Sequence, residues 1–410
     1  MSQDQPHGTD RRSFLQAGTL AAAAAAAGTG SALAQDPPAP VIPKRKLGKT
    51  GVEVTMLNQG AIRGSQTERV LRFSYASGVR VFDTAKVYGT EPTLRRWFEA
   101  MPEVRKNIFL VTKDMPKDAS EIPAMVDDRL KSLGVDSIDL FFIHGFGDAH
   151  KLDVAVDLIK SPELGRVVDA VKKSGKIKHF GFSSHHKDRA ALITAAAEGG
   201  IVDAIMLQYR PWLEKESPLN KAIDAAWKAN IGLISMKQIA GNFFGDKPEG
   251  NILDDVKKKV PMLEERKLSP FQGLLHAIWT DERISTVCVS MRNTDQIREN
   301  VDACRRYEPL KTADILQLRD AALAARHTLC ADCDGRCSEA AGTRAELGNL
   351  TRFLTYHEQH GDRIEARRAY AALAPEARDW AGADLDAARR ACPSNLDFAS
   401  LLPEADELLA

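Results

Sequence analysis

Short apolar runs alternate with amphipathic stretches between residue 44 and about residue 305 of this chain. Residues 138–143 read Ile-Asp-Leu-Phe-Phe-Ile, and residues 108–111 read Ile-Phe-Leu-Val. Mostly continuous apolar runs of this length are typical of parallel strands that are buried on both faces. The pattern predicts eight strands, at residues 58–63, 79–83, 108–113, 138–143, 178–182, 203–207, 231–236 and 285–289.

Helical patterns occupy the stretches between these strands. Residues 125–133 are amphipathic with a helical period, and Gly134 follows them as a C-terminal stop. Strands that alternate with helices form a parallel sheet, and eight of them favour a closed barrel over an open sheet. No G-x-G-x-x-G motif follows the first strand, which counts against a dinucleotide-binding open sheet. We therefore expect an α/β protein with a (β/α)8 TIM barrel over residues 44–320.

Polar residues stand where the predicted strands end. In such barrels the chemistry lies at the carboxyl ends of the strands, so these residues are candidates for one site. Tyr88 is on the loop that follows the second strand. The strand exits themselves carry Asp83, Lys113, His144, Ser183, Gln208 and Lys237.

Four of these residues match the chemistry of carbonyl reduction. Hydride delivery to a carbonyl leaves a developing alkoxide, which a positioned acid such as Tyr88 can protonate. A neighbouring cation, Lys113, can lower the pKa of that hydroxyl, and Asp83 supplies the carboxylate that a buried lysine needs. His144 can donate a hydrogen bond to the carbonyl oxygen. Each residue alone has an ordinary structural explanation, so the prediction depends on their occurring together.

The motifs around these residues resemble the aldo/keto reductase family. Residues 82–89, Phe-Asp-Thr-Ala-Lys-Val-Tyr-Gly, resemble the signature around the catalytic Asp and Tyr. Thr112-Lys113 resembles the strand-end lysine, and residues 139–144 resemble the strand that carries the histidine. Residues 47–51 are similar to the opening hairpin. The resemblance implies a reductase of small carbonyl substrates that uses a nicotinamide cofactor, with Asp83, Tyr88, Lys113 and His144 as its catalytic residues.

The resemblance also assigns the cofactor site. Arg292 is where it could meet a 2′-phosphate, which favours NADP(H) over NAD(H). Two positions depart from the family pattern, Asn58 in the first strand and Ser184 in place of an asparagine. The implied cofactor-binding residues are Gly60, Ala61, Asp83, Ser183, Ser184, Gln208, Lys237, Arg292, Gln296, Glu299 and Asn300.

Residues 321–410 form a predicted C-terminal helical extension that contains cysteines. Amphipathic runs cover residues 350–356, 364–370 and 398–409. The cysteine spacing is C-x2-C-x3-C, with a further cysteine before Pro393, and ferredoxin-type runs are similar. The segment resembles the iron–sulfur extension of a subset of aldo/keto reductases, although His327 stands where the run's first cysteine would be. The implied [4Fe–4S] ligands are Cys330, Cys333, Cys337 and Cys392.

Three alternatives to an iron–sulfur cluster stay open from the residues alone. Four cysteines can hold a structural zinc ion. In an oxidising compartment they can form two disulfides. They can also be relict ligands that bind nothing.

The first 34 residues resemble a twin-arginine (Tat) export signal. Arg11-Arg12 precedes an alanine-rich apolar run, and Ala32-Leu33-Ala34 offers a small-residue cleavage site. The run is too short and interrupted for a stable membrane span. We therefore expect the Tat machinery as a partner, a Pro-rich linker at 35–43 and a periplasmic protein. Because the periplasm offers no obvious pool of reduced nicotinamide, we expect a structural cluster or an external electron donor.

Composition narrows the classes of function. Lys and Arg number 56 and so do Asp and Glu, and this balance argues against a nucleic-acid binder. Apolar residues make up 44%, enough for a packed core. The leading hypothesis is NADP-dependent reduction of an aldehyde or ketone. The alternative is an exported iron–sulfur electron-transfer or binding protein that reuses the barrel without nicotinamide turnover.

Overall fold

The computed structural model divides the chain into two units, residues 1–40 and residues 41–410. The described residues are 41–62, 66–147, 151–186, 188–213, 215–238, 252–324, 330, 335–359, 363–392 and 395–410. The predicted export signal therefore lies outside the described residues. Among the helices that are described, none is both long and apolar enough to cross a membrane.

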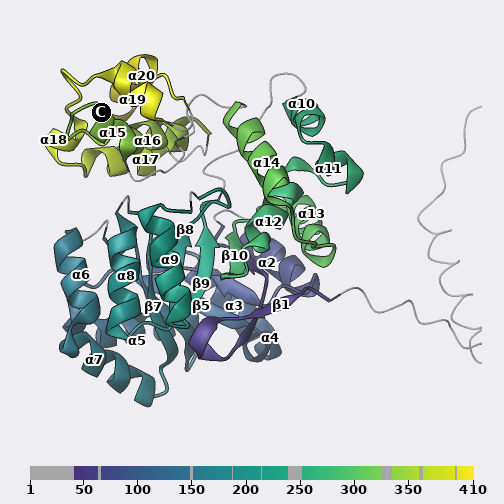
Figure 1. Ribbon diagram of the computed structural model, residues 1–410. Coiled ribbons are helices and arrows are strands. Elements are labelled where there is room, and N and C mark those ends of the chain that lie inside the picture. Colours follow the sequence, from purple (N-terminus) through teal and green to yellow (C-terminus); the bar gives the residue numbers. More distant parts are fainter. Residues whose placement is uncertain are drawn as a thin grey trace, which may run out of the picture. The chain divides into compact units, whose positions relative to one another are not determined.

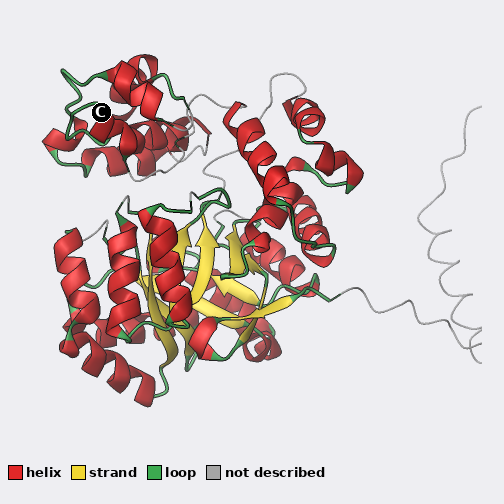
Figure 2. Cartoon of the chain, in the orientation of Figure 1, coloured by secondary structure: helices red, strands yellow, loops and turns green. Residues whose placement is uncertain are grey.

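Eight parallel strands close into a barrel, with helices packed around it (Figures 1 and 2). The strand order around the barrel is β10-β3-β4-β5-β6-β7-β8-β9, which confirms the predicted (β/α)8 fold. The ends differ from the predicted ones by up to four residues, and the largest difference is at β3, which ends at Gln59 although the pattern predicted a strand to residue 63. The strands are β3 (Leu57–Gln59), β4 (Val81–Asp83), β5 (Phe109–Asp114), β6 (Ile138–Ile143), β7 (Ile177–Ser184), β8 (Ala204–Gln208), β9 (Gly232–Met236) and β10 (Ile284–Val289).

The helices that follow the strands bury one face each against the barrel. Helix α5 ends where the sequence predicts, at Gly134, whose φ of 64° is the left-handed value that glycine tolerates. The helices are α2 (Thr67–Ala76), α3 (Glu91–Ala100), α4 (Pro102–Asn107), α5 (Ile122–Leu133), α6 (Leu152–Lys160), α7 (Pro162–Lys173), α8 (Arg189–Gly199), α9 (Pro218–Lys228), α10 (Ile252–Lys259), α11 (Pro261–Glu265), α12 (Pro270–Thr280), α13 (Thr294–Arg305) and α14 (Thr312–Ala324). Short 3-10 turns are η2 (Gly48–Thr50), η3 (Lys86–Tyr88) and η4 (Ala119–Glu121).

The opening hairpin pairs β1 (Lys44–Lys46) with β2 (Glu53–Thr55) in antiparallel register. Its turn lies against the start of β9, where a Cβ on Gly48 would be 2.3 Å from the Gly232 nitrogen. Only glycine fits this close approach of two backbones. Leu47 is fully buried in the inner core, so the hairpin seals the amino-terminal end of the barrel.

Side chains along each strand alternate between an inner and an outer core. On β6, Leu140 and Phe142 belong to the inner cluster, whereas Phe141 and Ile143 belong to the outer one. Alternation of this kind fills the barrel interior in layers. The next inward position after Phe142 falls beyond the strand, at His144. The strand register therefore decides which polar side chains at the mouth point toward the barrel axis, as the inner core residues do.

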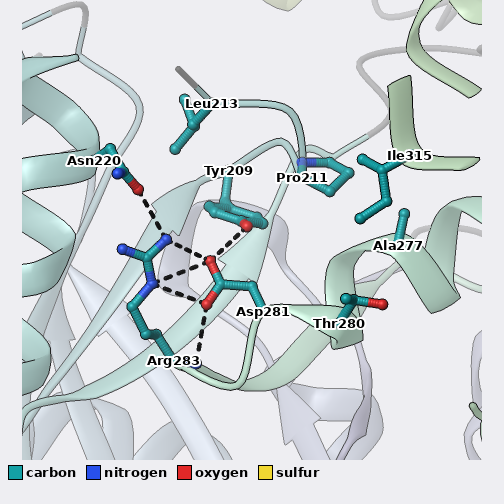
Figure 3. A pocket seen from close by; sticks show the side chains of 9 residues that line it. All are labelled: Tyr209, Pro211, Leu213, Asn220, Ala277, Thr280, Asp281, Arg283 and Ile315. Carbon is teal, nitrogen blue, oxygen red and sulfur yellow. Dashed lines mark hydrogen bonds and ion pairs between the residues drawn. The ribbon is translucent and has the colours of Figure 1, made fainter. Parts of the chain in front are cut away.

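A network of charged side chains joins α9 to the segment between α12 and β10 outside the barrel (Figure 3). Arg283 bonds Asp281 at 2.6 Å, Asp224 at 2.5 Å and Asn220 at 2.8 Å, and the Tyr209 hydroxyl donates to Asp281 at 2.7 Å. Burial alone would raise the pKa of Asp281, but its bonds with Arg283 outweigh this and lower it. The cavity beside the network measures about 170 Å³. These side chains satisfy one another, so the network joins the start of α9 to the segment that leads into β10.

The C-terminal segment has a hydrophobic core of its own. The predicted amphipathic runs fall in α16, α17 and α20, whose buried residues include Leu350, Ala366 and Leu402. Asp406 accepts hydrogen bonds from the Tyr370 hydroxyl at 2.7 Å and the Trp380 ring at 2.9 Å. The helices are α15 (Arg336–Ala340), α16 (Leu347–Gln359), α17 (Arg363–Ala371), α18 (Pro375–Arg378), α19 (Leu385–Ala391) and α20 (Phe398–Leu409).

Candidate active site

A buried ion pair joins the carboxyl ends of β4 and β5. Lys113 Nζ donates to Asp83 Oδ1 and also to the Thr84 carbonyl oxygen, the latter at 2.9 Å. The two residues continue the inward positions of Val81 and Val111, which explains why both point to the barrel axis. Burial raises the pKa of Asp83, and the charge of Lys113 works against that rise. Only 1% of Lys113 is exposed, so the pair holds its geometry without help from water.

Tyr88 and His144 meet beside this pair. The Tyr88 hydroxyl lies 3.2 Å from His144 Nε2, and the two rings stand edge to face with centroids 5.4 Å apart. Lys113 Nζ lies 5.5 Å from the centre of the Tyr88 ring. Burial lowers the pKa of His144 to about 3, with further lowering by Lys113 and Lys237. His144 is therefore a neutral imidazole at neutral pH, and the structure brings the four predicted catalytic residues together at one mouth.

Buried amide and hydroxyl groups form the floor of the mouth. Gln208 is completely buried, and among the described residues neither its Oε1 nor its Nε2 has a hydrogen-bond partner. The Ser183 hydroxyl accepts from the Gly145 nitrogen at 3.2 Å. A buried amide without partners is costly, so Gln208 is a residue that a bound carboxamide would satisfy. These groups fit the nicotinamide end of the predicted cofactor.

The two departures from the family pattern lie on the same floor. Asn58 is completely buried in β3 beside Cys288 of β10, and neither atom of its amide has a partner among the described residues. The Ser184 hydroxyl accepts from the His186 nitrogen at 3.3 Å, which shapes the turn after β7. Ser184 is thus used in a local turn, while Asn58 adds a second buried amide without a partner.

The loop after β3 carries Gly60 and Ala61 close to the end of β10. A Cβ on Gly60 would lie 2.9 Å from the Ser290 hydroxyl and 3.1 Å from the Val289 carbonyl carbon. The Gly60 nitrogen donates to the Val289 oxygen at 2.8 Å. Packing against the end of β10 therefore favours glycine at position 60. Ala61 follows it and is half-buried.

The predicted adenine and phosphate residues surround the start of α13. Arg292 is exposed there, and its backbone nitrogen donates to Gln296 Oε1 at 2.7 Å. Asn300 is buried one turn further along the helix. Glu299 accepts a hydrogen bond from the Ser269 hydroxyl, at the cap of α12. The exposed Arg292 is thus open to a ligand, whereas Gln296 Oε1 and Glu299 already have hydrogen-bond partners within the protein.

Lys237 follows β9 in a left-handed conformation, with φ of 51°. Such a φ is uncommon for a residue with a side chain and clusters at functional sites. Its Nζ lies 5.2 Å from the centre of the Tyr356 ring on α16. The ammonium group acts on His144 as well, which places Lys237 at the same mouth.

Arg189 is a buried residue of the site that the sequence did not indicate. Its guanidinium donates to the carbonyl oxygens of Gln208 at 3.2 Å and His186 at 2.9 Å. These bonds tie the end of β8 to the turn after β7, so Arg189 positions Gln208. The residue lies at the start of α8 rather than at a strand exit, and no spacing along the chain marks it.

Three of the four predicted metal ligands share the core of the C-terminal segment. Cys330, Cys337 and Cys392 belong to or pack against this core, and a Cβ on Gly348 would be 3.3 Å from the Cys330 sulfur and 3.8 Å from the Cys337 sulfur. Burial raises the pKa of Cys337 to about 11, and the other two cysteines add to the rise. Cys333 lies outside the described residues. Within the described part of the chain, no three potential ligands are arranged as a metal site.

Comparison with known proteins agrees with this geometry. The family model described as "Aldo/keto reductase family" matches residues 54–322. The chain belongs to the aldo/keto reductase family and is an oxidoreductase by that membership. The C-terminal segment beyond residue 322 lies outside the match.

Two relatives illustrate the similarity. An aldo-keto reductase of Schizosaccharomyces pombe whose name specifies NADP(+) is 27% identical over 278 residues, covering 60% of this chain and 75% of the relative. A 6-dehydroglucose reductase of Novosphingobium aromaticivorans is 29% identical over 173 residues, covering 36% of this chain and 54% of the relative. Among solved structures, the holo form of an aldo-keto reductase from Bacillus halodurans has the same fold, with a TM-score of 0.55, 20% identity and coverage of 68% of this chain and 96% of that one. The alternative of a barrel without turnover gains no support from these relatives.

Proposed function

We propose that this protein reduces an aldehyde or ketone with NADPH and that Tyr88 donates the proton. The observation that carries the proposal is the cluster at the mouth: the Tyr88 hydroxyl is 3.2 Å from His144 Nε2, and Lys113 is held beside it by Asp83. The relatives named as reductases support the class of reaction. Each group in the cluster has a distinct task.

The proton moves from Tyr88 to the substrate oxygen. As negative charge develops on that oxygen, the nearby Tyr88 hydroxyl can transfer its proton to it. Lys113 stabilises the tyrosinate that remains, and the ion pair with Asp83 holds Lys113 in place. His144 is neutral, so it can donate a hydrogen bond to the oxygen without competing for the proton. These four side chains account for the proton transfer to the substrate oxygen.

The floor and one rim of the mouth fit NADPH. NADPH supplies the hydride when it is bound. Gln208 and Ser183 would hold the carboxamide, since Gln208 has two buried polar atoms without partners among the described residues. Arg292 is exposed at the start of α13, where a helix N-terminus and a guanidinium together favour a phosphate.

Replacing Arg292 with methionine tests the cofactor assignment. We expect the Kd for NADPH to rise about tenfold to a hundredfold, because the variant loses a charged hydrogen bond to the 2′-phosphate. The Kd for NADH should change little, because NADH lacks that phosphate. A fluorescence titration of the purified protein measures both. Arg298→Met on the same helix is the matched control, because Arg298 is exposed and pairs with Asp295. Equal losses for the two cofactors, or no NADPH binding by the natural protein, would contradict the proposal.

We infer that Cys330, Cys333, Cys337 and Cys392 hold a [4Fe–4S] cluster, with zinc as the alternative. Support comes from the shared core around three of these cysteines and from their spacing. An iron–sulfur cluster passes single electrons whereas a nicotinamide transfers a hydride, so we expect the cluster to be structural or to meet an external electron donor.

Metal analysis of protein purified without oxygen tests the cluster. We expect about four iron atoms per chain with a broad visible absorption, and loss of both in Cys337→Ser. Cys304→Ala is the control, since Cys304 is buried in α13 away from the segment. One zinc ion in place of iron would support the alternative, and disulfides or empty thiols would overturn both.

We also propose that the protein is exported to the periplasm through the Tat machinery. The support is the order of Arg11-Arg12, the apolar run and the small-residue exit in the sequence. Changing both arginines to lysine should leave the protein in the cytoplasmic fraction. Unchanged export would contradict the route.

A further inference from the structure

The turn that carries Tyr88 has little structure of its own. Turn η3 is a single 3-10 turn, and its backbone bonds run from the Tyr88 nitrogen to the Ala85 oxygen at 3.0 Å and from the Gly89 nitrogen to the Lys86 oxygen at 3.2 Å. Hydrogen bonds in such turns have poorer geometry than those in α-helices, and one turn alone is not stable in water. Contacts with other elements must therefore fix where η3 holds the Tyr88 hydroxyl.

An ion pair joins this turn to the carboxyl end of β5. Lys86 Nζ lies 3.4 Å from Asp114 Oδ2, which is an ion-pair distance rather than a hydrogen bond. Asp114 directly follows Lys113 on the strand, and successive side chains of a strand point to opposite faces. The pair therefore lies next to the catalytic cluster but on the outer side of the barrel wall.

Two buried side chains support Asp114 from neighbouring helices. Arg129 Nε of α5 lies 3.4 Å from Asp114 Oδ2, and Arg129 Nη1 donates to Glu91 Oε2 of α3 at 2.7 Å. Glu91 Oε1 also accepts from the Thr112 hydroxyl of β5 at 2.7 Å. At most 8% of any of the three charged side chains is exposed. Because buried polar networks with satisfied partners are rigid, Asp114 is a fixed point to which the turn is attached.

The backbone of Asp114 holds the partner of Tyr88 as well. Its carbonyl oxygen accepts from the His144 nitrogen at 2.9 Å. One residue thus contacts the Tyr88 turn through its side chain and His144 through its main chain. In the proposed reaction the Tyr88 hydroxyl and His144 both turn to the substrate oxygen, so their mutual contact cannot by itself hold the turn. The ion pair between Lys86 and Asp114 involves no reacting group and persists through the reaction.

We propose that Asp114 is a positioning residue that, through its ion pair with Lys86, keeps the Tyr88 hydroxyl beside His144 and within reach of the substrate oxygen. The inference rests on the proposed carbonyl reduction and adds two residues to it. About half of the Lys86 side chain is exposed, and ion pairs of this kind contribute little to stability. Displacing a reacting group by about 1 Å, however, can lower the rate about a hundredfold. Loss of the pair should therefore change kcat rather than folding.

Replacing Lys86 with methionine tests this role, because it removes the charge and keeps the length of the side chain. We expect kcat to fall about tenfold or more, while KM for the carbonyl substrate and Kd for NADPH stay within about twofold. Lys86→Arg should recover most of kcat, since a contact of 3.4 Å depends on charge more than on bond direction. Thermal unfolding should be the same for all three proteins. An unchanged kcat in Lys86→Met, or a loss that Lys86→Arg does not recover, would overturn the inference.

Lys176→Met is the matched control. Lys176 directly precedes β7, at the amino end of the barrel, and pairs with Asp127 of α5 at 2.6 Å. Its side chain is 41% exposed, close to the 48% of Lys86. The control thus removes one exposed ion pair far from the mouth and should leave kcat unchanged. An equal loss of kcat in Lys176→Met and Lys86→Met would count against a specific role for Asp114.

A double-mutant cycle shows whether Lys86 and Asp114 act through one contact. Asp114→Asn keeps the shape of the side chain and an oxygen for the Met115 nitrogen, which Asp114 Oδ1 accepts at 2.9 Å. We expect the variant with both substitutions to lose no more kcat than Asp114→Asn alone, because each substitution breaks the same pair. Losses that multiply would mean that the two residues act independently and would overturn the inference. If Asp114→Asn unfolds, Lys86→Met and its arginine rescue decide the question.

Fluorine NMR follows Tyr88 without turnover. The chain has six tyrosines, so protein labelled with 3-fluorotyrosine gives a small set of signals, and Tyr88→Phe identifies the one from Tyr88. We expect this signal to shift in Lys86→Met and to stay in place in Lys176→Met, because only the first variant releases the turn. If the natural protein reduces no carbonyl, the proposed function fails while this measurement still decides the positioning role. A Tyr88 signal that Lys86→Met leaves unchanged overturns it.

Discussion

Replacing Tyr88 with phenylalanine should lower kcat for carbonyl reduction about a thousandfold, the scale of a lost general acid. The phenyl ring keeps its packing against His144, and Lys113 loses only the oxygen it would stabilise. The Kd for NADPH should therefore stay within about twofold of the natural value. Steady-state kinetics with a fluorescence titration measures both quantities.

Tyr75→Phe is the matched control for this substitution. Tyr75 packs edge to face on Trp97 in the outer layer, far from the mouth in the fold, and should keep full activity. Tyr88→Phe with unchanged kcat would remove Tyr88 from the acid role, and the reaction would then need another proton donor. A large loss of cofactor affinity would instead show that the hydroxyl serves binding.

Lys113→Met should combine the largest loss of stability with a large loss of activity. The substitution leaves Asp83 buried without its cation, which costs about 3–5 kcal/mol in the free energy of unfolding. We expect kcat to fall about a hundredfold or more, because the tyrosinate loses its stabilising charge. Denaturant unfolding and steady-state kinetics check the two effects.

The double variant Asp83→Asn with Lys113→Met separates stability from catalysis. Removing both charges takes away the uncompensated carboxylate, so most of the lost stability should return. Activity should not return, since no cation stands beside Tyr88. Recovery of kcat in the double variant would contradict the catalytic role of Lys113. If the single and double variants lose the same free energy of unfolding, Lys113 contributes to stability through packing rather than through its charge.

The period of the strands explains why the catalytic cluster could be predicted. Phe109, Val111 and Lys113 follow one another at alternate positions of β5, so the apolar pattern that fills the barrel also carries the lysine to the mouth. On β6 the inward positions are Leu140 and Phe142, and the next is His144. Sequence period and parallel register together bring such residues to one end of a barrel.

Arg189 and the α16 side chains could not be predicted in the same way. Arg189 acts through carbonyl oxygens of Gln208 and His186, and a backbone acceptor leaves no mark in the sequence. Tyr356 meets Lys237 from more than a hundred residues away along the chain. Helical periodicity shows that α16 has a buried face, but it does not show which part of the protein that face covers.

By itself the sequence determined the barrel, the order of its eight strands and the residues at the strand exits, because hydrophobic period and chain order are local properties. Only the tertiary structure decided that the Tyr88 hydroxyl meets His144, that the Gln208 amide is buried without partners among the described residues, and that Tyr356 of α16 contacts Lys237. These features depend on side-chain rotamers and on packing between distant segments, and neither is fixed until the whole core is assembled.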